Sequence, residues 1–388
     1  MTGLFNKIVF KDFVTLQRGF DLPAQQRIDG EYPIIASTSV TGFHNEWKVD
    51  PPGVVTGRSG ALGEVQYVTK RFWPLNTALW VKDFKGNHPR FVYYKLKTLD
   101  LKRFNSGAGV PTLNRNDLDT LELEVPDLRT QCRIASILSA YDDQIENNMR
   151  RIAILEEMAR RIYEEWFVRF RFPGHEKVKM VESELGLIPY GWSWGQLRDI
   201  AYDVRDSVNP DATDPATPYV GLEHIPRRST ALSEWGAASD VQSMKLRFNS
   251  GDILFGKIRP YFHKVAVAPV AGVASSDAII IRAKEPHWFP LALSTVFSDA
   301  FIAEATQSSN GTKMPRANWN VLLGYKVPIP TNEVRGQFNA CMNNMIEYIK
   351  NTTLRNRNLR ATRDLLLPKL ISGELDVPNP PEPEAIVA

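Results

Sequence analysis

Two long stretches of this 388-residue chain carry apolar residues at alternating steps of four and three, and this spacing limits the possible folds most strongly. The first stretch runs from Gln131 to about Phe172, and the second lies near the C-terminus. Such spacing predicts a helix with one continuous apolar stripe, as in a coiled coil. At about 1.5 Å per residue, the first helix would extend for roughly 55 to 60 Å, longer than most globular domains are wide. A stripe of this length requires a partner.

The two stripes match each other in length and spacing. The first consists of Ile134, Leu138, Tyr141, Ile145, Asn148, Ile152, Leu155, Ala159, Ile162 and Trp166. The second consists of Phe338, Met342, Met345, Ile349, Thr352, Asn356, Leu359, Arg363, Leu366 and Leu370. Two matched stripes favour an intramolecular pair of helices, although each helix could instead lie as an ordinary amphipathic helix on its own domain. Each stripe contains one asparagine, Asn148 or Asn356, and a buried asparagine can fix the register of paired helices.

Outside the stripes, both stretches are charged, and the first ends in aromatic residues. Acidic residues precede basic ones by four positions, the order that favours ion pairs along a helix, at Glu146 and Arg150, Glu156 and Arg160, Glu157 and Arg161, and Glu165 and Arg169. The aromatic residues would either contact a partner or pack beneath the following domain, and they are Trp166, Phe167, Phe170 and Phe172. The second stretch has a basic side that would face DNA phosphate, an acidic partner or solvent, formed by Arg355, Arg357, Arg360 and Arg363.

Composition excludes several classes of protein. The only cysteines, Cys132 and Cys341, provide neither a disulfide framework nor a cysteine metal cluster, and we expect both to be small core residues in a reducing compartment. No uninterrupted apolar run is long enough to span a bilayer, so we expect a cytoplasmic protein. A formal charge of +3 is too small to argue for nucleic-acid binding by itself, and the local clustering of basic residues is more informative.

The remaining sequence divides into two blocks of short β-branched runs separated by Gly, Pro and Asn, which is typical of strands and turns. We therefore predict an α+β fold in which two β-rich domains are separated by an intramolecular antiparallel coiled coil of two long helices. The predicted domains are a first β-rich domain at 1–129, a first helix at 130–172, a second β-rich domain at 173–331, a second helix at 332–373 and a disordered tail at 374–388.

The second half of the chain repeats the order of the first at an offset of about 200 residues, which indicates one large duplicated unit rather than a series of short repeats. The matching positions are Gly57 with Gly256, Pro111 with Pro315, and Pro126 with Pro328. A duplication of this kind predicts pseudo-twofold symmetry. Two unlike β-rich domains on similar helices would be suited to recognising two different short sequences at a fixed separation on DNA.

Loops with Lys, Arg, Asn and aromatic residues recur at matching places in the two blocks. The segment GRSGALG lacks the Gly-Lys-Ser/Thr ending of a phosphate loop and no βαβ unit follows, so its glycines favour close approach to a DNA backbone or a plain tight turn. The candidate DNA contacts in the first block are Arg58, Lys70, Arg71, Arg103, Asn105, Thr112, Asn114 and Arg115. Those in the second block are Lys257, Arg259, Tyr261, His263, Lys264, Lys313, Arg316 and Asn318.

Three segments resemble the specificity subunits of type I restriction-modification systems. They are QCRIASILSAYDDQIENNMRRIAILEEMARRIYEEWFVRFRF, GLIPYGWSWGQL and LRATRDLLLPKLISGELDV. The order of the segments is more specific than any one of them, and the resemblance extends over nearly the whole chain. The resemblance implies two target-recognition domains and a non-catalytic DNA reader that binds two methyltransferase subunits and recruits restriction subunits. It also implies that S-adenosylmethionine, ATP and Mg²⁺ belong to those partners, and that no cofactor binds this chain.

The residues agree with a reader that lacks its own chemistry. An adenine methyltransferase needs Asn/Asp-Pro-Pro before an aromatic residue to hold a flipped base, whereas Asp50-Pro51-Pro52 precedes Gly53 and Asn379-Pro380-Pro381 precedes Glu382. Neither a HExxH metal motif nor an acidic cluster for a nuclease is present. The alternatives are a specificity subunit of a methylation-only or other phage-defence system, an enzyme acting on a carbohydrate or nucleotide, and a scaffolding coiled coil.

Overall fold

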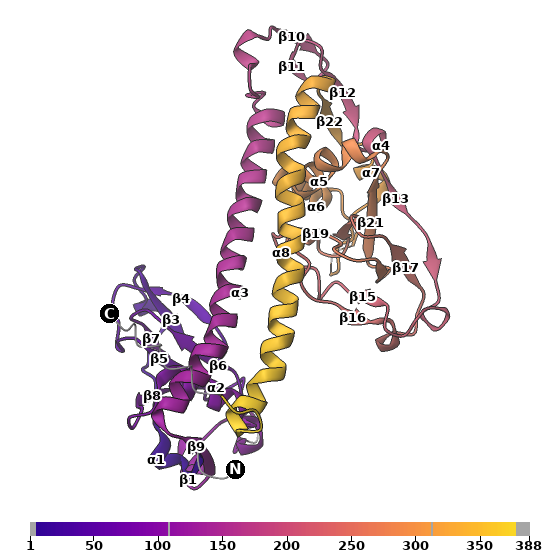
Figure 1. Ribbon diagram of the computed structural model, residues 1–388. Helices are drawn as coiled ribbons and strands as arrows, with labels where there is room; N and C mark the ends of the chain where they lie inside the picture. Colours follow the sequence, from indigo (N-terminus) through magenta and orange to yellow (C-terminus); the bar gives the residue numbers. More distant parts are fainter. Residues whose placement is uncertain (1–4, 108, 312, 378–388) are drawn as a thin grey trace, which may run out of the picture. The chain divides into compact units, whose positions relative to one another are not determined.

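A computed structural model describes residues 5–107, 109–311 and 313–377 of the chain (Figure 1). These residues form two compact units, which are residues up to 144 with those from 360, and residues 145–359. Each unit contains one β-rich domain together with one end of each long helix. We call the β-rich domain of the first unit head one and that of the second unit head two. These helices are α3, Leu128–Tyr163, and α8, Asn332–Ser372. The predicted disordered tail lies outside the described residues from 378 onward.

The two long helices pair in antiparallel fashion within each unit. In the second unit, Asn148 Nδ2 donates a hydrogen bond to Asn356 Oδ1 at 2.8 Å, and the rings of Trp166 and Phe338 lie 5.8 Å apart. In the first unit, Asp142 forms an ion pair with Arg363. Residue numbers therefore rise along α3 as they fall along α8. Every residue of the two predicted stripes is buried or half-buried, and Asn148 and Asn356 are each only 3% exposed.

Head one is built from three small sheets and a helix that packs on them. The antiparallel four-stranded sheet has the order β2-β8-β5-β6, with bounds Thr15–Arg18, Ala78–Asp83, Gly53–Gly57 and Val65–Val68. The three-stranded sheet has the order β4-β3-β7, with bounds Val40–His44, Tyr32–Ile35 and Trp73–Pro74. The remaining elements are β1, Phe5–Val9, paired with β9, Glu122–Pro126, and the helices α1, Phe10–Phe13, and α2, Pro89–Thr98.

Head two repeats this topology with additions. Its four-stranded sheet has the order β13-β21-β18-β19, with bounds Ala201–Val204, Ala278–Ala283, Ile253–Gly256 and Val265–Val267. Its second sheet has the order β14-β17-β20-β15-β16, with bounds Ser207–Val208, Lys245–Phe248, Gly272–Ala274, Pro218–Val220 and Gly236–Ala237. The other elements are β12, Ser193–Gln196, paired with β22, Lys326–Ile329, and the hairpin β10, Met180–Ser183, with β11, Gly186–Pro189. Its helices are α4, Leu197–Ile200, α5, Phe289–Phe297, α6, Asp299–Gln307, and α7, Trp319–Leu322.

This shared topology confirms the predicted α+β fold with an antiparallel helix pair and an internal duplication. Gly57 ends β5 opposite Ala78, and Gly256 ends β18 opposite Ala278, so the two glycines occupy the same place. The predicted match of Pro126 with Pro328 is wrong by two residues. Phe10 N donates to Leu121 O and Leu197 N donates to Tyr325 O, so the positions correspond at an offset of 204 residues (325 − 121) and Pro126 matches Pro330. The sequence V-P-I-P offers two prolines, and the strand register selects the later one.

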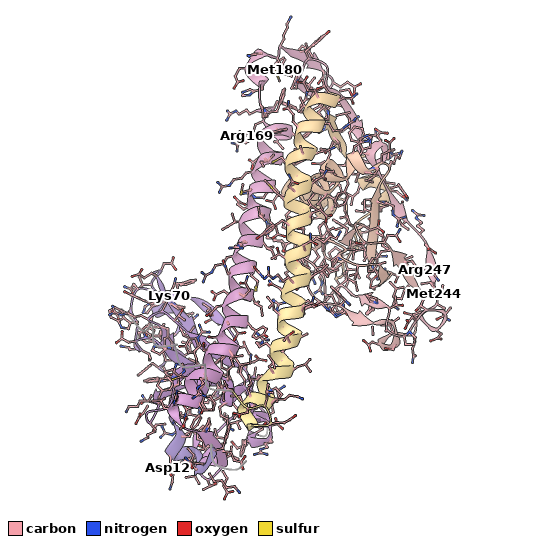
Figure 2. All side chains as sticks on the ribbon, in the orientation of Figure 1. Asp12, Lys70, Arg169, Met180, Met244 and Arg247 are labelled. Atoms are coloured by element: carbon pink, nitrogen blue, oxygen red, sulfur yellow. The ribbon has the colours of Figure 1, made fainter. Side chains whose placement is uncertain are left out.

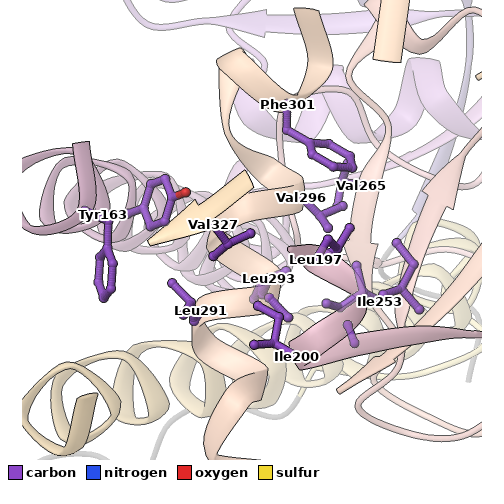
Figure 3. Close-up of a cluster of buried hydrophobic side chains, with 14 of the residues drawn as sticks. Tyr163, Leu197, Ile200, Ile253, Val265, Leu291, Leu293, Val296, Phe301 and Val327 are labelled. Atoms are coloured by element: carbon purple, nitrogen blue, oxygen red, sulfur yellow. The ribbon is translucent and has the colours of Figure 1, made fainter. Parts of the chain in front are cut away.

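The aromatic end of the first helix packs into the core of the second unit rather than remaining available to a partner. A π-helical turn, Glu164–Val168, follows α3, and Phe167 and Phe172 are buried. Trp166 and Phe170 are half-buried against the same core, where Phe172 stacks on Trp192. Figure 3 shows Tyr163 of α3 beside the side chains of α5, α6 and the sheet that complete this cluster.

Three expectations about individual side chains are corrected by the structure. Cys132 is exposed rather than part of the core, and Cys341 is half-buried. Glu156 does not pair with Arg160, which instead contacts Glu157 and Glu164. The other ion pairs predicted for the first helical stretch form as expected, with Glu165 and Arg169, just beyond α3, at 2.8 Å. Of the described residues, no helix is both long and apolar enough to cross a membrane.

The buried asparagine pair yields a test of the helix register. Asn148→Ala should lower the free energy of unfolding by about 1 to 3 kcal/mol, because the buried amide of Asn356 loses a hydrogen-bonding partner. Replacing both asparagines with leucine should cost less than the single change, since neither buried side-chain amide is then left without the other. The midpoint of urea unfolding measures each effect. Asn147→Ala on the exposed face of α3 is the control, and an equal loss of stability in that variant would contradict this explanation.

Candidate nucleic-acid interface

A network of main-chain hydrogen bonds shapes the loops at one end of the four-stranded sheet in head one. The amide nitrogens donate to carbonyl oxygens from Arg58 to Thr77 (2.8 Å), from Gly60 to Pro111 (2.9 Å) and from Leu113 to Arg58 (2.8 Å). The network fastens the loop after β5 to the loop 105–115. Only glycine fits at position 57, because a Cβ atom there would lie 1.9 Å from the carbonyl oxygen of Ala61.

Head two contains the same network at the corresponding positions. Its amide nitrogens donate from Lys257 to the carbonyl oxygen of Asp277 (3.0 Å), from Arg259 to that of Pro315 (2.7 Å) and from Ala317 to that of Lys257 (2.8 Å). Arg58 therefore corresponds to Lys257, and Pro111 to Pro315, as the sequence predicted. Each head thus presents one basic side chain at the same point of a loop cluster whose shape depends on main-chain atoms.

Four of the predicted side chains of head one lie together around a groove of about 780 Å³. These residues are Arg58, Thr112, Asn114 and Arg115. Arg58 Nη1 donates to the carbonyl oxygen of Asn76 at 3.2 Å, and Arg115 Nη1 donates to that of Leu16 at 3.2 Å. Guanidinium groups carry several further N–H donors, so both arginines can hold these positions while donating to a phosphate or a base edge.

The other four predicted residues of head one differ in their surroundings. Asn105 lies in the same loop, and its Oδ1 accepts hydrogen bonds from the amides of Gly107 and Thr112, so this side chain shapes the loop. Arg103 lies over the ring of Phe104. Arg71 forms an ion pair with Asp50 at 2.9 Å and stacks on Trp47, away from the groove. Lys70 is exposed beside it, and Figure 2 shows its side chain projecting from the head.

In head two, four predicted residues surround the matching loops. Lys313 and Arg316 are exposed, and Asn318 precedes the short helix α7. Arg316 lies 3.6 Å from Asp277, and the Lys257 ammonium donates to the carbonyl oxygen of Ser276. Asp277 therefore partly offsets the positive charge of these loops.

The remaining four predicted residues of head two form the turn after β18. Arg259 and Tyr261 lie at the surface of this turn, with Tyr261 exposed. The Lys264 ammonium donates to the carbonyl oxygen of Leu222, and burial lowers the pKa of this lysine. His263 is only 3% exposed, and its Nε2 lies 2.9 Å from the carbonyl oxygen of Phe297. We leave His263 out of the proposed interface because its ring is enclosed by the protein.

Sequence reasoning missed an arginine beside the groove of head one. Arg18 ends β2 and lines the groove with Arg58. Phe10 corresponds to Leu197, an offset of 187 residues (197 − 10), so Arg18 corresponds to Arg205 directly after β13. Arg205 is exposed and contacts Asp203. Aligning the two halves at the starts of their first strands would have revealed this basic pair.

The side chains that gather around these loops are mainly hydrogen-bond donors. Among them, no three His, Cys, Asp or Glu side chains come close enough together to hold a metal ion. Arginine, lysine and amide side chains around a groove can donate hydrogen bonds to phosphate and base edges. The arrangement is therefore that of a binding surface.

Comparisons with known proteins agree with the resemblance seen in the sequence. Residues 5–157 match the family described as the type I restriction modification DNA specificity domain. The chain is 28% identical to the type I restriction enzyme MjaIX specificity subunit of Methanocaldococcus jannaschii, over 85% of this chain and 79% of that protein. It is 24% identical to the EcoDI specificity subunit of Escherichia coli, over 89% and 83%. The fold is similar to that of a type I restriction-modification system S subunit from M. genitalium, with a TM-score of 0.65 and 14% identity over 97% and 98% of the two chains.

The matching basic residues yield a test of the interface. Arg58→Ala and Lys257→Ala should each weaken binding to duplex DNA and flatten its salt dependence, because removing one phosphate contact lowers the slope of log affinity against log salt by about 0.9. Fluorescence anisotropy over a series of salt concentrations measures both quantities. Lys82→Ala and Lys284→Ala, at exposed positions near the other ends of the sheets, are the controls. Unchanged affinity and slope in both test variants would remove these loops from the DNA face.

The buried histidine yields a separate test of stability against pH. Burial and the nearby Arg228 lower the pKa of His263, although Asp299 opposes this shift. As pH falls below the ordinary histidine value of about 6.5, the unfolded chain gains a proton that the folded chain resists, so stability falls. His263→Asn, which tolerates the left-handed backbone at this position, should reduce the loss of melting temperature between about pH 6.5 and pH 5. An unchanged pH profile would contradict this assignment.

Proposed function

We propose that this chain, which resembles type I specificity subunits along its length, is the DNA-reading subunit of a type I restriction-modification complex. In this proposal, head one and head two each recognise a short DNA sequence, and the two sequences differ and are separated by a spacer of fixed length. The chain itself would be non-catalytic.

One observation supports this proposal above the others. Two heads of the same topology carry the same main-chain network, and each places a basic side chain, Arg58 or Lys257, at the same point of it. Around this shared network, the loops differ in length, charge and sequence. A common scaffold with unlike displayed side chains suits two readers of the same polymer that recognise different base sequences.

The helix pair suits a spacer between the two readers. An antiparallel pair with a buried asparagine contact has one defined register, so its length is fixed by its sequence. The proposed target-recognition domains are residues 1–129 and 173–331, and the proposed spacer helices are residues 130–172 and 332–373. These boundaries are predictions from the sequence.

The proposed complex assigns the chemistry to other subunits. Two methyltransferase subunits would carry S-adenosylmethionine and modify adenine, and restriction subunits would use ATP and Mg²⁺. A complex that modifies cellular DNA works in the cytoplasm, and we propose that location for this chain. The stem helices and the surfaces beside them are the proposed contacts for the methyltransferases.

Mapping adenine methylation across the genome tests this function directly. Cells that carry the gene together with its methyltransferase partner should methylate one split motif with two specific parts and a constant spacer. Cells without the gene should lack methylation at that motif. The measurement is long-read sequencing that detects modified adenine.

Variants of the two heads provide the matched controls. Loop substitutions in head one should change one part of the motif, and those in head two the other part. Methylation at an undivided motif, or at the same motif after the gene is deleted, would overturn the proposal. If the native system methylates the motif but does not restrict DNA that lacks this methylation, the methylation-only alternative is identified.

A further inference from the structure

One connection between strands is much longer in head two than in head one. In head one, a turn at residues 36–39 joins β3 to β4, and it closes with a hydrogen bond from the amide of Ala36 to the carbonyl oxygen of Ser39 at 3.0 Å. The corresponding strands of head two are β15 and β16, since β15 pairs in parallel with β20 as β3 does with β7. Residues 221–235 join them. We call this longer connection the anchor segment.

The anchor segment is fixed to its own head. Ile225 and Leu232 are buried in the core of head two. The amide of Val267 in β19 donates to the carbonyl oxygen of Thr230 at 2.9 Å, and the amide of Arg228 donates to that of His263 at 2.9 Å. The segment therefore moves with the sheet to which it is attached.

The same segment contacts α3 through a half-buried carboxylate. Glu156 Oε1 accepts hydrogen bonds from Ser229 Oγ (2.9 Å), from the amide of Thr230 (2.6 Å) and from Thr230 Oγ1 (2.8 Å). Burial raises the pKa of Glu156, which reflects the cost of placing this carboxylate away from water. Three donors at one oxygen offset that cost, because they favour the charged form.

A second contact joins the anchor segment to α8. The guanidinium carbon of Arg357 lies 3.6 Å from the ring centroid of Trp235, a close cation–π arrangement. The segment thus contacts both long helices of the second unit, α3 through Glu156 and α8 through Arg357. These two contacts involve different residues of the segment and different helices, so together they resist rotation as well as translation.

Apolar packing between head two and the helices is incomplete near Glu156. A cavity of about 310 Å³ lies there, with apolar side chains forming most of its wall. Its lining includes Glu156, Tyr163, Thr230, Phe297, Met342 and Ile349. Side chains around such a cavity lack some van der Waals contacts, so the neighbouring polar contacts contribute more to holding head two in place.

We propose that Glu156 and Arg357 are positioning residues that hold head two in one orientation on the helix pair through the anchor segment. This second step rests on the proposed function: the orientation of head two sets the length of the DNA spacer that the complex accepts. One added base pair moves a half-site by about 3.4 Å and rotates it by about 35°. A head held in one orientation rejects such a change, whereas a head that can tilt accommodates it.

The orientation is tested first without DNA. Spin labels at Ile154→Cys on α3 and Met244→Cys on head two occupy exposed positions, 60% and 54% exposed (Figure 2 labels Met244). The background carries Cys132→Ser and Cys341→Ser. Double electron–electron resonance on the full chain should give a distance distribution roughly twofold broader in Glu156→Ala than in the unsubstituted background. Arg357→Ala should broaden it as well.

Matched variants separate positioning from general stability. Glu156→Gln keeps an oxygen that accepts hydrogen bonds and should retain a narrow distribution. Glu146→Ala removes an exposed glutamate of the same helix and should have no effect. If the distribution in both Glu156→Ala and Arg357→Ala is as narrow as in the background, the positioning role is overturned, whatever the DNA result.

The second measurement is methylation by the assembled complex on DNA with the native spacer and with spacers one base pair shorter or longer. The unsubstituted complex should prefer the native spacer by about 100-fold or more, and the Glu156→Ala complex by about tenfold or less, with the native rate changed only several-fold. If the two complexes prefer the native spacer equally, the proposed link between the orientation of head two and the spacer length is overturned. A complex without any split target would overturn the proposed function, while the resonance measurement would still decide the positioning role.

Discussion

The antiparallel packing of α3 against α8 is the interaction on which the remaining structure depends. Both heads are attached to these helices, and within each unit the helices present their apolar stripes to one another. At the level of Asn148 and Asn356 the stripes become polar, and one buried amide hydrogen bond replaces apolar contact. A slip of either helix would bury one amide against apolar side chains, which costs more than the bond itself contributes. The asparagine pair therefore excludes other registers.

Both heads pack on the helices through apolar clusters, but the two units differ in the polar contacts between head and helices. In the first unit, α2 contacts α3 through side-chain polar groups, with Tyr94 Oη donating to Asp142 at 2.6 Å and Arg90 paired with Asp143 at 2.9 Å. In the second unit, an extended connection between strands reaches Glu156 and Arg357. Duplication thus preserved the sheet topology while the attachment of each sheet to its helices diverged.

Much of the fold follows from patterns that are local or repeated in the sequence. The alternation of steps of four and three is imposed by helix geometry, so it predicted both long helices and their shared polar layer. Gly57 and Gly256 were recognisable as matching positions because each ends a short strand-like run and precedes a basic residue. Prediction failed where long-range contacts decide the outcome. Glu156 has the spacing of a surface ion pair, but it is half-buried and accepts hydrogen bonds from Thr230, which lies in a distant connection between strands.

The candidate interface was predicted less completely than the fold, for a physical reason. A basic residue near a strand end has the same sequence signature whether it faces solvent or is enclosed, and only tertiary packing distinguishes His263 from Tyr261. Arg18 was missed because it lies far in sequence from the loops it joins. The structural correspondence of Arg58 with Lys257 was predicted from the duplication, since two independent occurrences of one backbone position are stronger support than one.

The loop clusters of both heads are held by hydrogen bonds between main-chain amides and carbonyls, and every amino acid except proline supplies these same groups. If Gly57 and the loop-shaping Asn105 are kept, exchanging the other side chains that the loops display leaves the scaffold beneath them intact. A surface built in this way can acquire new preferences through a few substitutions, without first having to evolve a new fold.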